Sequence, residues 1–137
     1  MVTDENHQQP LELILARNLM SSLSTPALLV DTNGVLVFFN DAAGSLLGQR
    51  YEEAGKMPWE EWGSRYGPFD DGGTPIPFEE MPLTIALREG HPAHHHQTIR
   101  SHGGEPHEVE VSAMPLVSAE GGFRGAIVFF WREGEDG

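Results

Sequence analysis

The chain has 137 residues, of which 39% are hydrophobic, and it contains no cysteine. This length suits one domain with a single core, and the missing cysteine excludes disulfides, cysteine-ligated zinc sites, thiol nucleophiles and cysteinyl adducts. The net charge of -13, from 21 acidic against 8 basic residues, repels phosphate groups and anionic lipid, which argues against nucleic acid and membranes as partners.

The two ends of the chain are expected to be tails. Residues 1–9 are polar and should be disordered, and residues 133–137 should form a solvated acidic tail, leaving one domain over 10–132. The first five residues carry acids rather than the basic stretch of a secretory signal. No apolar run approaches the length that crosses a bilayer, so a cytoplasmic location is expected.

An amphipathic helix is expected to begin at Pro10, since proline suits the first turn of a helix. A broad apolar stripe follows at helical spacing and must lie against an apolar surface, either the sheet of the same chain or a second subunit. The stripe consists of Leu13, Leu15, Ala16, Leu19, Met20 and Leu23.

The next segment predicts a β-hairpin. Residues 27–31 and 35–40 are apolar runs. Asn33 and Gly34 between them tolerate the positive φ angles of a two-residue turn. The hairpin supplies two strands to a sheet.

Short helices are expected in the middle of the chain. Asn40 can cap the first of them, and Gly48 can end it. Pro82 is placed to begin the last, and Gly90 to end it. Their expected ranges are 42–47, 52–54, 58–65 and 82–89.

The C-terminal part predicts three strands. Residues 93–102 and 107–117 flank a turn, and Pro115 restricts the far end of the second strand to an edge or a bulge. Residues 125–131 are apolar on both alternating faces, so this strand should lie in the middle of the sheet.

Histidines gather around the first of these strands. His94 and His96 share a face and could chelate a divalent metal, with His91 or a carboxylate completing the site. There are two alternatives to metal binding. The histidines could simply be exposed polar residues on an edge strand, or they could form a switch that titrates at about pH 6. His102 and His107 could meet across the hairpin.

The element order and several local motifs resemble those of a PAS domain of bacterial signalling proteins. The resemblance covers residues 11–132 and implies an α+β fold, a five-stranded antiparallel sheet with helices on one face and the N-terminal amphipathic helix beside it. The chain would be a stand-alone protein or part of a larger sensor. The motifs lie at 26–34, 40–48, 73–90, 111–116, 121–122 and 125–128.

The resemblance implies a sensory or regulatory module in signal transduction that binds a small apolar ligand, a protein partner or both, and that forms a homodimer. The sequence contains no nucleophile elbow or phosphate-binding loop, so no enzymatic activity is expected. The alternatives are a metal- or haem-responsive protein that uses the histidines of 91–96, and a ligand-free adaptor. Haem-binding relatives usually offer a histidine from the longer helix, where residues 77–90 have none. Non-covalent flavin stays open, and the sequence does not identify a cofactor.

Two sets of side chains follow from this interpretation. The expected ligand pocket, with a plain filled core as the alternative, consists of Met57, Trp59, Trp62, Phe69, Leu83, Ile85, Leu87, Val111, Met114, Ile127 and Phe129. The expected dimer or sheet cover consists of Leu15, Leu19, Met20, Leu23, Val128 and Phe130. In the last strand, Ile127 and Phe129 are therefore assigned to the helices, and Ala126, Val128 and Phe130 to the opposite face.

Overall fold

The structure, a computed structural model, describes residues 11–132 except 71, 119, 121 and the side chain of Glu12. Both expected tails lie outside the described residues. The elements in chain order are α1 (Leu11–Met20), β1 (Ala27–Val30), β2 (Leu36–Phe39), α2 (Asp41–Leu47), α3 (Tyr51–Ala54), α4 (Trp59–Tyr66), the 3-10 turn η1 (Phe78–Glu80), α5 (Pro82–Glu89), β3 (Ala93–Arg100), β4 (Pro106–Val117) and β5 (Phe123–Arg132).

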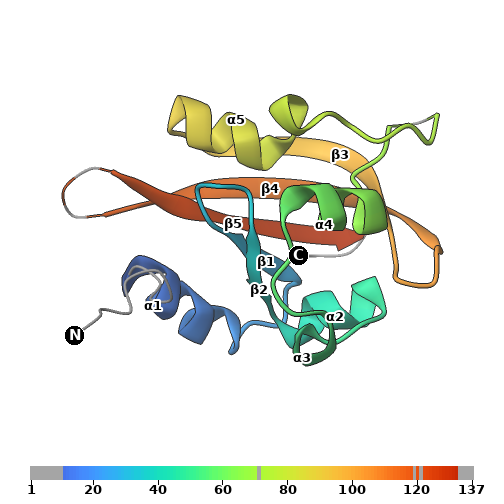
Figure 1. The fold of residues 1–137 in the computed structure, drawn as a ribbon, viewed down its shortest axis with the longest axis horizontal. Helices are drawn as coiled ribbons and strands as arrows, with labels where there is room; N and C mark the ends of the chain where they lie inside the picture. The colour runs from blue at the N-terminus through green and yellow to red at the C-terminus, as the bar shows by residue number, and fades with distance from the viewer. Residues whose placement is uncertain (1–10, 71, 119, 121, 133–137) are drawn as a thin grey trace.

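The described strands form one antiparallel sheet with the order β2-β1-β5-β4-β3 (Figure 1). The last strand, β5, therefore lies in the middle, as its two apolar faces predict. It joins the N-terminal hairpin to the C-terminal strands through pairs such as Leu29 with Ile127. No helix in the described part of the chain is long and apolar enough to span a membrane.

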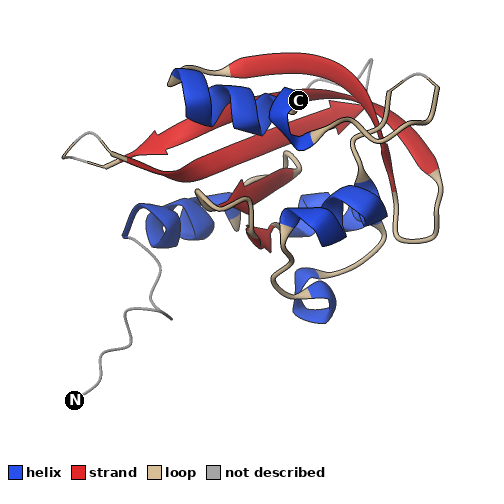
Figure 2. Cartoon of the chain, turned by 45° about the horizontal axis from the view of Figure 1, so that its top comes forward, coloured by secondary structure: helices blue, strands red, loops and turns tan. Residues whose placement is uncertain are grey.

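Helices lie against both faces of the sheet, as Figure 2 shows for α5 and α1. One core contains side chains of α2, α4 and α5 together with Ala126, Val128 and Phe130 of β5. A second core lies between α1 and the opposite face, and it contains Ile127. Phe129 packs against this second core.

The expected assignment of the two faces of β5 is therefore wrong and has to be reversed. Val128 pairs with Leu28, and Ile127 pairs with Leu29, whose side chain is buried with α1. Directly paired residues of antiparallel strands point to the same face of the sheet. Because both faces of β5 are apolar, its own sequence could not reveal which one meets the helices.

The β1–β2 hairpin forms as predicted, but its turn is longer than two residues. The N–H of Asp31 donates to the carbonyl of Val35 over 2.9 Å, which leaves residues 32–34 in the turn. The Asp31 carboxylate accepts from the N–H groups of Asn33 and Val35 at 2.8 and 3.0 Å. Gly34 has a φ of 83°, which suits glycine. The aspartate side chain thus stabilises the wider turn.

The predicted helix ends agree with the structure in two helices. Asn40 caps α2, and α5 begins at Pro82. Gly48 and Gly90 end these helices with φ values of 75° and 74°. The expected edge position of Pro115 is also confirmed: β3 reaches only as far as Ala113 along β4, so Pro115 pairs with β5 alone.

Candidate functional site: an apolar cavity against the sheet

An apolar cavity of about 60 Å³ lies between the sheet and helices α4 and α5. The main side chains around it are Trp62, Tyr66, Met81, Leu83, Gln97, Ile99, Val111, Val128 and Phe130.

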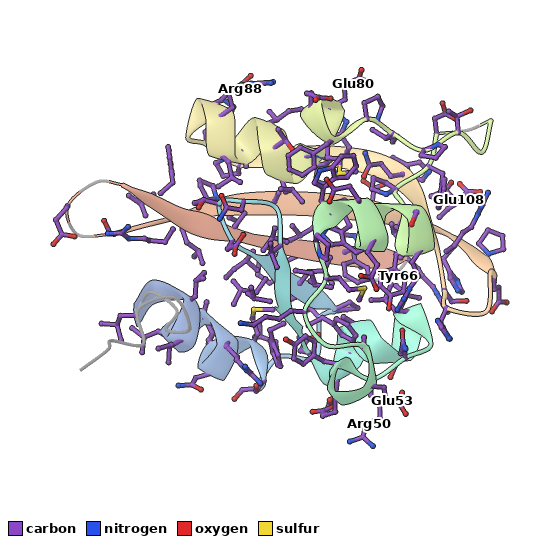
Figure 3. All side chains as sticks on the ribbon, in the orientation of Figure 1. Arg50, Glu53, Tyr66, Glu80, Arg88 and Glu108 are labelled. Atoms are coloured by element: carbon purple, nitrogen blue, oxygen red, sulfur yellow. The ribbon has the colours of Figure 1, made fainter. Side chains whose placement is uncertain are left out.

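Two aromatic side chains of α4 are fixed at the cavity wall by hydrogen bonds. The indole N–H of Trp62 donates to the carbonyl of Gly34 over 2.9 Å. The hydroxyl of Tyr66, which is labelled in Figure 3, donates to Oε1 of Gln49 over 2.7 Å. Burial raises the pKa of Tyr66, so the hydroxyl stays protonated and able to donate. Both polar groups are thus committed to protein partners, and the rings present apolar surface to the cavity.

Of the expected pocket residues, Trp62, Leu83 and Val111 line the cavity. Met57 is buried in the same core without lining the cavity. Phe69 is also buried, and the guanidinium of Arg100 lies 4.0 Å from the centre of its ring. The half-buried Trp59 and Leu87 pack against the edge of the core.

The other four expected pocket residues lie elsewhere. Ile85 is half-buried on α5 and does not line the cavity, and Met114 is 40% exposed. Ile127 and Phe129 belong to the opposite face, beside α1. Alternation along β4 and β5 explains these positions: Met114 and Ile127 form a cross-strand pair on the outer face, so neither can reach the cavity.

Several lining residues were not predicted from the sequence, and Gln97 is the most informative of them. Gln97 is 6% exposed and lies two residues before the buried Ile99 on β3. Residues two apart on a strand share a face. That spacing could have placed Gln97 on the buried face with Ile99. The strand was instead interpreted from its histidines, which lie on exposed positions.

The expected sheet cover is divided between the two faces. Met20 is fully buried between α1 and the sheet, and Leu23 is half-buried. Val128 and Phe130 line the cavity instead, which corrects their assignment.

Leu15 and Leu19 point to solvent and are 57% and 59% exposed. Leu11 and Ile14 beside them are 63% and 45% exposed. The apolar residues of α1 are spread too widely around the helix for one face to bury them all. These four side chains are called the outer row of α1 below.

His94 and His96 converge on one carboxylate rather than on a third histidine. Nε2 of His94 lies 2.6 Å from Oε1 of Glu110, and Nδ1 of His96 lies 2.9 Å from Oε2. The hydrogen bonds from His96 and then from His94 lower the pKa of Glu110. No group of three His, Asp or Glu side chains among the described residues is arranged to hold a metal ion. Metal binding by this pair stays a prediction.

The remaining histidines are separate from this pair. His91 lies 3.0 Å from the carboxylate of Glu89. His107 pairs with Ile99 across the hairpin, whereas His102 lies in the turn, where its N–H donates to the carbonyl of Leu47. The expected meeting of His102 and His107 is therefore wrong, because the hairpin closes between Ser101 and Glu105, which leaves His102 inside the turn.

The sheet order, the helices α4 and α5 on one face of the sheet and the apolar cavity beneath them can be compared with known proteins. A family model described as the PAS fold matches residues 15–132. The chain belongs to the PAS family. This assignment agrees with the α+β fold and the five-stranded antiparallel sheet expected from the sequence.

Solved structures with the same fold come from several bacteria. The PAS domain of Bordetella pertussis BvgS is similar with a TM-score of 0.61 and 17% identity, covering 90% of this chain and 87% of that one. The PAS domain of the nitrogen regulation protein NR(II) from Vibrio parahaemolyticus has a TM-score of 0.62 and 17% identity, covering 86% and 97%. A Rhodobacter sphaeroides LOV protein has a TM-score of 0.67 and 12% identity, covering 92% and 69%.

A search of curated protein sequences gave no match. At these identities the structural likeness establishes the fold alone. The PAS fold is typical of sensor modules in signal transduction, which are generally not catalytic. The particular ligand and partner must be argued from the residues of this chain.

Proposed function

We propose that this PAS domain is a sensory or regulatory module that binds a small, largely apolar ligand in the cavity and transmits its presence to the surface around α1. The observation that carries the proposal is the position of β5. Val128 and Phe130 line the cavity, whereas Ile127 and Phe129 of the same strand contact the core under α1. A displacement of β5 by a ligand therefore reaches both faces of the sheet.

The chemistry of the cavity supports an apolar ligand. Among the described residues, its lining contains aliphatic and aromatic side chains, the thioether of Met81 and the amide of Gln97, but no Lys, Arg, His, Asp or Glu. Methionine adapts to occupants of irregular shape. A charged ligand would lose its hydration without gaining an ionic partner, which is costly.

The outer row of α1 supports the second part of the proposal, a homodimer or a protein partner at this face. Four large apolar side chains on one short helix are more than α1 needs to cover its own sheet. A ligand signal that reaches the core under α1 would then change a surface that contacts another subunit. The protein partner, the cytoplasmic location and the domain limits of 10–132 stay predictions.

Xenon tests the cavity, because it enters small apolar cavities without needing a polar partner. We expect xenon to shift the backbone amide NMR signals of Val128 and Leu83, and also those of α1. Val111→Phe should fill the cavity and abolish both sets of shifts. Val117→Phe is the matched control, since Val117 lies on the same strand and is 48% exposed.

The two parts of the proposal give different results. Xenon shifts that Val111→Phe leaves unchanged would contradict binding in this cavity. Shifts near Val128 without any response in α1 would leave a binding site but contradict transmission through β5.

A further inference from the structure

We propose that the ligand of this cavity carries a hydrogen-bond donor, an N–H or O–H group, which the side-chain oxygen of Gln97 accepts. The inference rests on the proposed function, because it requires that the cavity binds a ligand. It goes further by naming the recognising residue and the chemical class of the ligand.

Gln97 is the polar side chain that the sheet contributes to the cavity. It pairs with Val109 in the middle of the β3–β4 ladder, and it is 6% exposed. Its Oε1 atom is buried and has no hydrogen-bond partner among the residues that the structure describes. A buried amide oxygen without a partner destabilises the folded protein, and such atoms are rare in native structures. A functional reason for keeping glutamine here is therefore expected.

The cavity wall does not supply the missing donor. Among its side chains, Trp62 and Tyr66 could donate, but the indole N–H bonds the carbonyl of Gly34 and the hydroxyl bonds Gln49. Apart from Gln97 itself, the other side chains of the lining end in carbon or in the sulfur of Met81. A molecule in the cavity is thus the available source of a donor for Gln97.

The same lining restricts the size of the ligand and the number of its polar groups. The cavity of about 60 Å³ requires a compact body, and the adaptable Met81 in its wall can move to admit a somewhat larger one. Since Gln97 offers one unpaired oxygen within an apolar surface, one donor group on an apolar body fits best. Small alcohols and N–H heterocycles belong to this class.

Pyrrole and furan form a matched pair of probes, because both are five-membered rings and only pyrrole has an N–H. Dissociation constants come from titrations followed by backbone amide NMR, with wild type and with Gln97→Met. One hydrogen bond gained is typically worth a fivefold change in affinity. For each protein the preference is the dissociation constant of furan divided by that of pyrrole. We expect this ratio to be about fivefold larger for wild type than for Gln97→Met.

Thr98→Val is the control, since Thr98 neighbours Gln97 on β3 but its alternate position points to the other face. It should keep the wild-type preference. Gln97→Met removes an unpaired polar atom and should not lower the melting temperature. If methionine nevertheless prevents folding, Gln97→Leu takes its place.

The outcomes separate this inference from the proposed function. An equal preference for pyrrole in wild type and Gln97→Met would overturn the role of Gln97 while ligand binding by the cavity stands. If neither ring shifts the signals of the folded wild type, this inference is overturned. If xenon also fails, ligand binding by the cavity is overturned as well.

Discussion

Asn40 shows how much one residue can connect in this domain. Its side chain is 2% exposed and makes four hydrogen bonds with backbone groups. Oδ1 accepts from Ala27 and Ala43 at 3.1 and 2.9 Å, and Nδ2 donates to the carbonyls of Met20 and Thr25 at 3.1 and 3.0 Å. The cap of α2 was predictable, because it involves a residue three positions away. The bonds to the end of α1 and the start of β1 depend on the fold.

The pKa of Glu110 is the second feature at the residue scale. It lies below the ordinary value of 4.5 because His96 and His94 hydrogen-bond the carboxylate. We predict that His96→Ala raises the pKa of Glu110 towards that value, and that His94→Ala does so too, because each substitution removes one hydrogen bond to the carboxylate. Carbon-detected NMR of the Glu110 carboxyl group during a pH titration measures this.

The sign of the effect on stability follows from linkage. A carboxyl group whose pKa is lower in the folded state stabilises that state above its unfolded pKa, and this contribution is lost as the pH falls through the lowered pKa. The contacts of Glu110 with His94 and His96 should therefore stabilise the folded state at neutral pH, and this stabilisation should be lost in acid. An unchanged Glu110 pKa in His96→Ala would show that the contact does not form in solution.

At the scale of the element, β5 depends on close contact with β1 at Gly125. Gly125 is buried with a φ of 147°, a conformation that favours glycine. A Cβ atom there would collide with the carbonyl oxygen of Val30 and press on Leu13 of α1. The glycine thus lets α1 and β1 pack closely at the start of the central strand.

We predict that Gly125→Ala lowers the free energy of unfolding by about 1–3 kcal/mol, the usual range for backbone strain or overpacking. Urea unfolding followed by tryptophan fluorescence provides the measurement. Gly103→Ala is the control, because nothing lies within 4 Å of the added Cβ and its φ is not positive. Equal effects of the two substitutions would argue against close packing at Gly125.

At the scale of the whole molecule, the outer row of α1 predicts a dimer. Exposed leucines lose contact with water when two copies associate, which favours the dimer in proportion to the apolar area buried. We predict that wild type shows a concentration-dependent rise in mass by light scattering. Leu15→Glu with Leu19→Glu should hold the protein as a monomer, because paired copies would bury the new charges.

The control for this prediction adds the same charge on other helices. Ser45→Glu on α2 with Ser64→Glu on α4 changes two exposed polar positions outside the outer row and should leave association unchanged. A wild type that stays monomeric at every concentration, or a leucine variant that still dimerises, would rule out this surface as the interface.

The sequence determined the features that depend on neighbouring residues. The caps and ends of α2 and α5, the β1–β2 hairpin and the two-sided burial of β5 follow from contacts within a few positions or from alternation along one strand. Element order and motifs were also enough to predict the PAS fold. Part of the cavity wall, such as Trp62 and Leu83, followed from the aromatic and apolar pattern around it.

Only the tertiary structure decided which face of β5 meets the cavity and where Gln97 lies. Both depend on the pairing of strands that are distant in sequence, such as Leu29 with Ile127. A shift of one residue in that register exchanges every side chain between the faces. A strand that is apolar on both sides carries no local signal to choose between them, so the choice came from the neighbouring strands and from the close approach of Gly125 to β1.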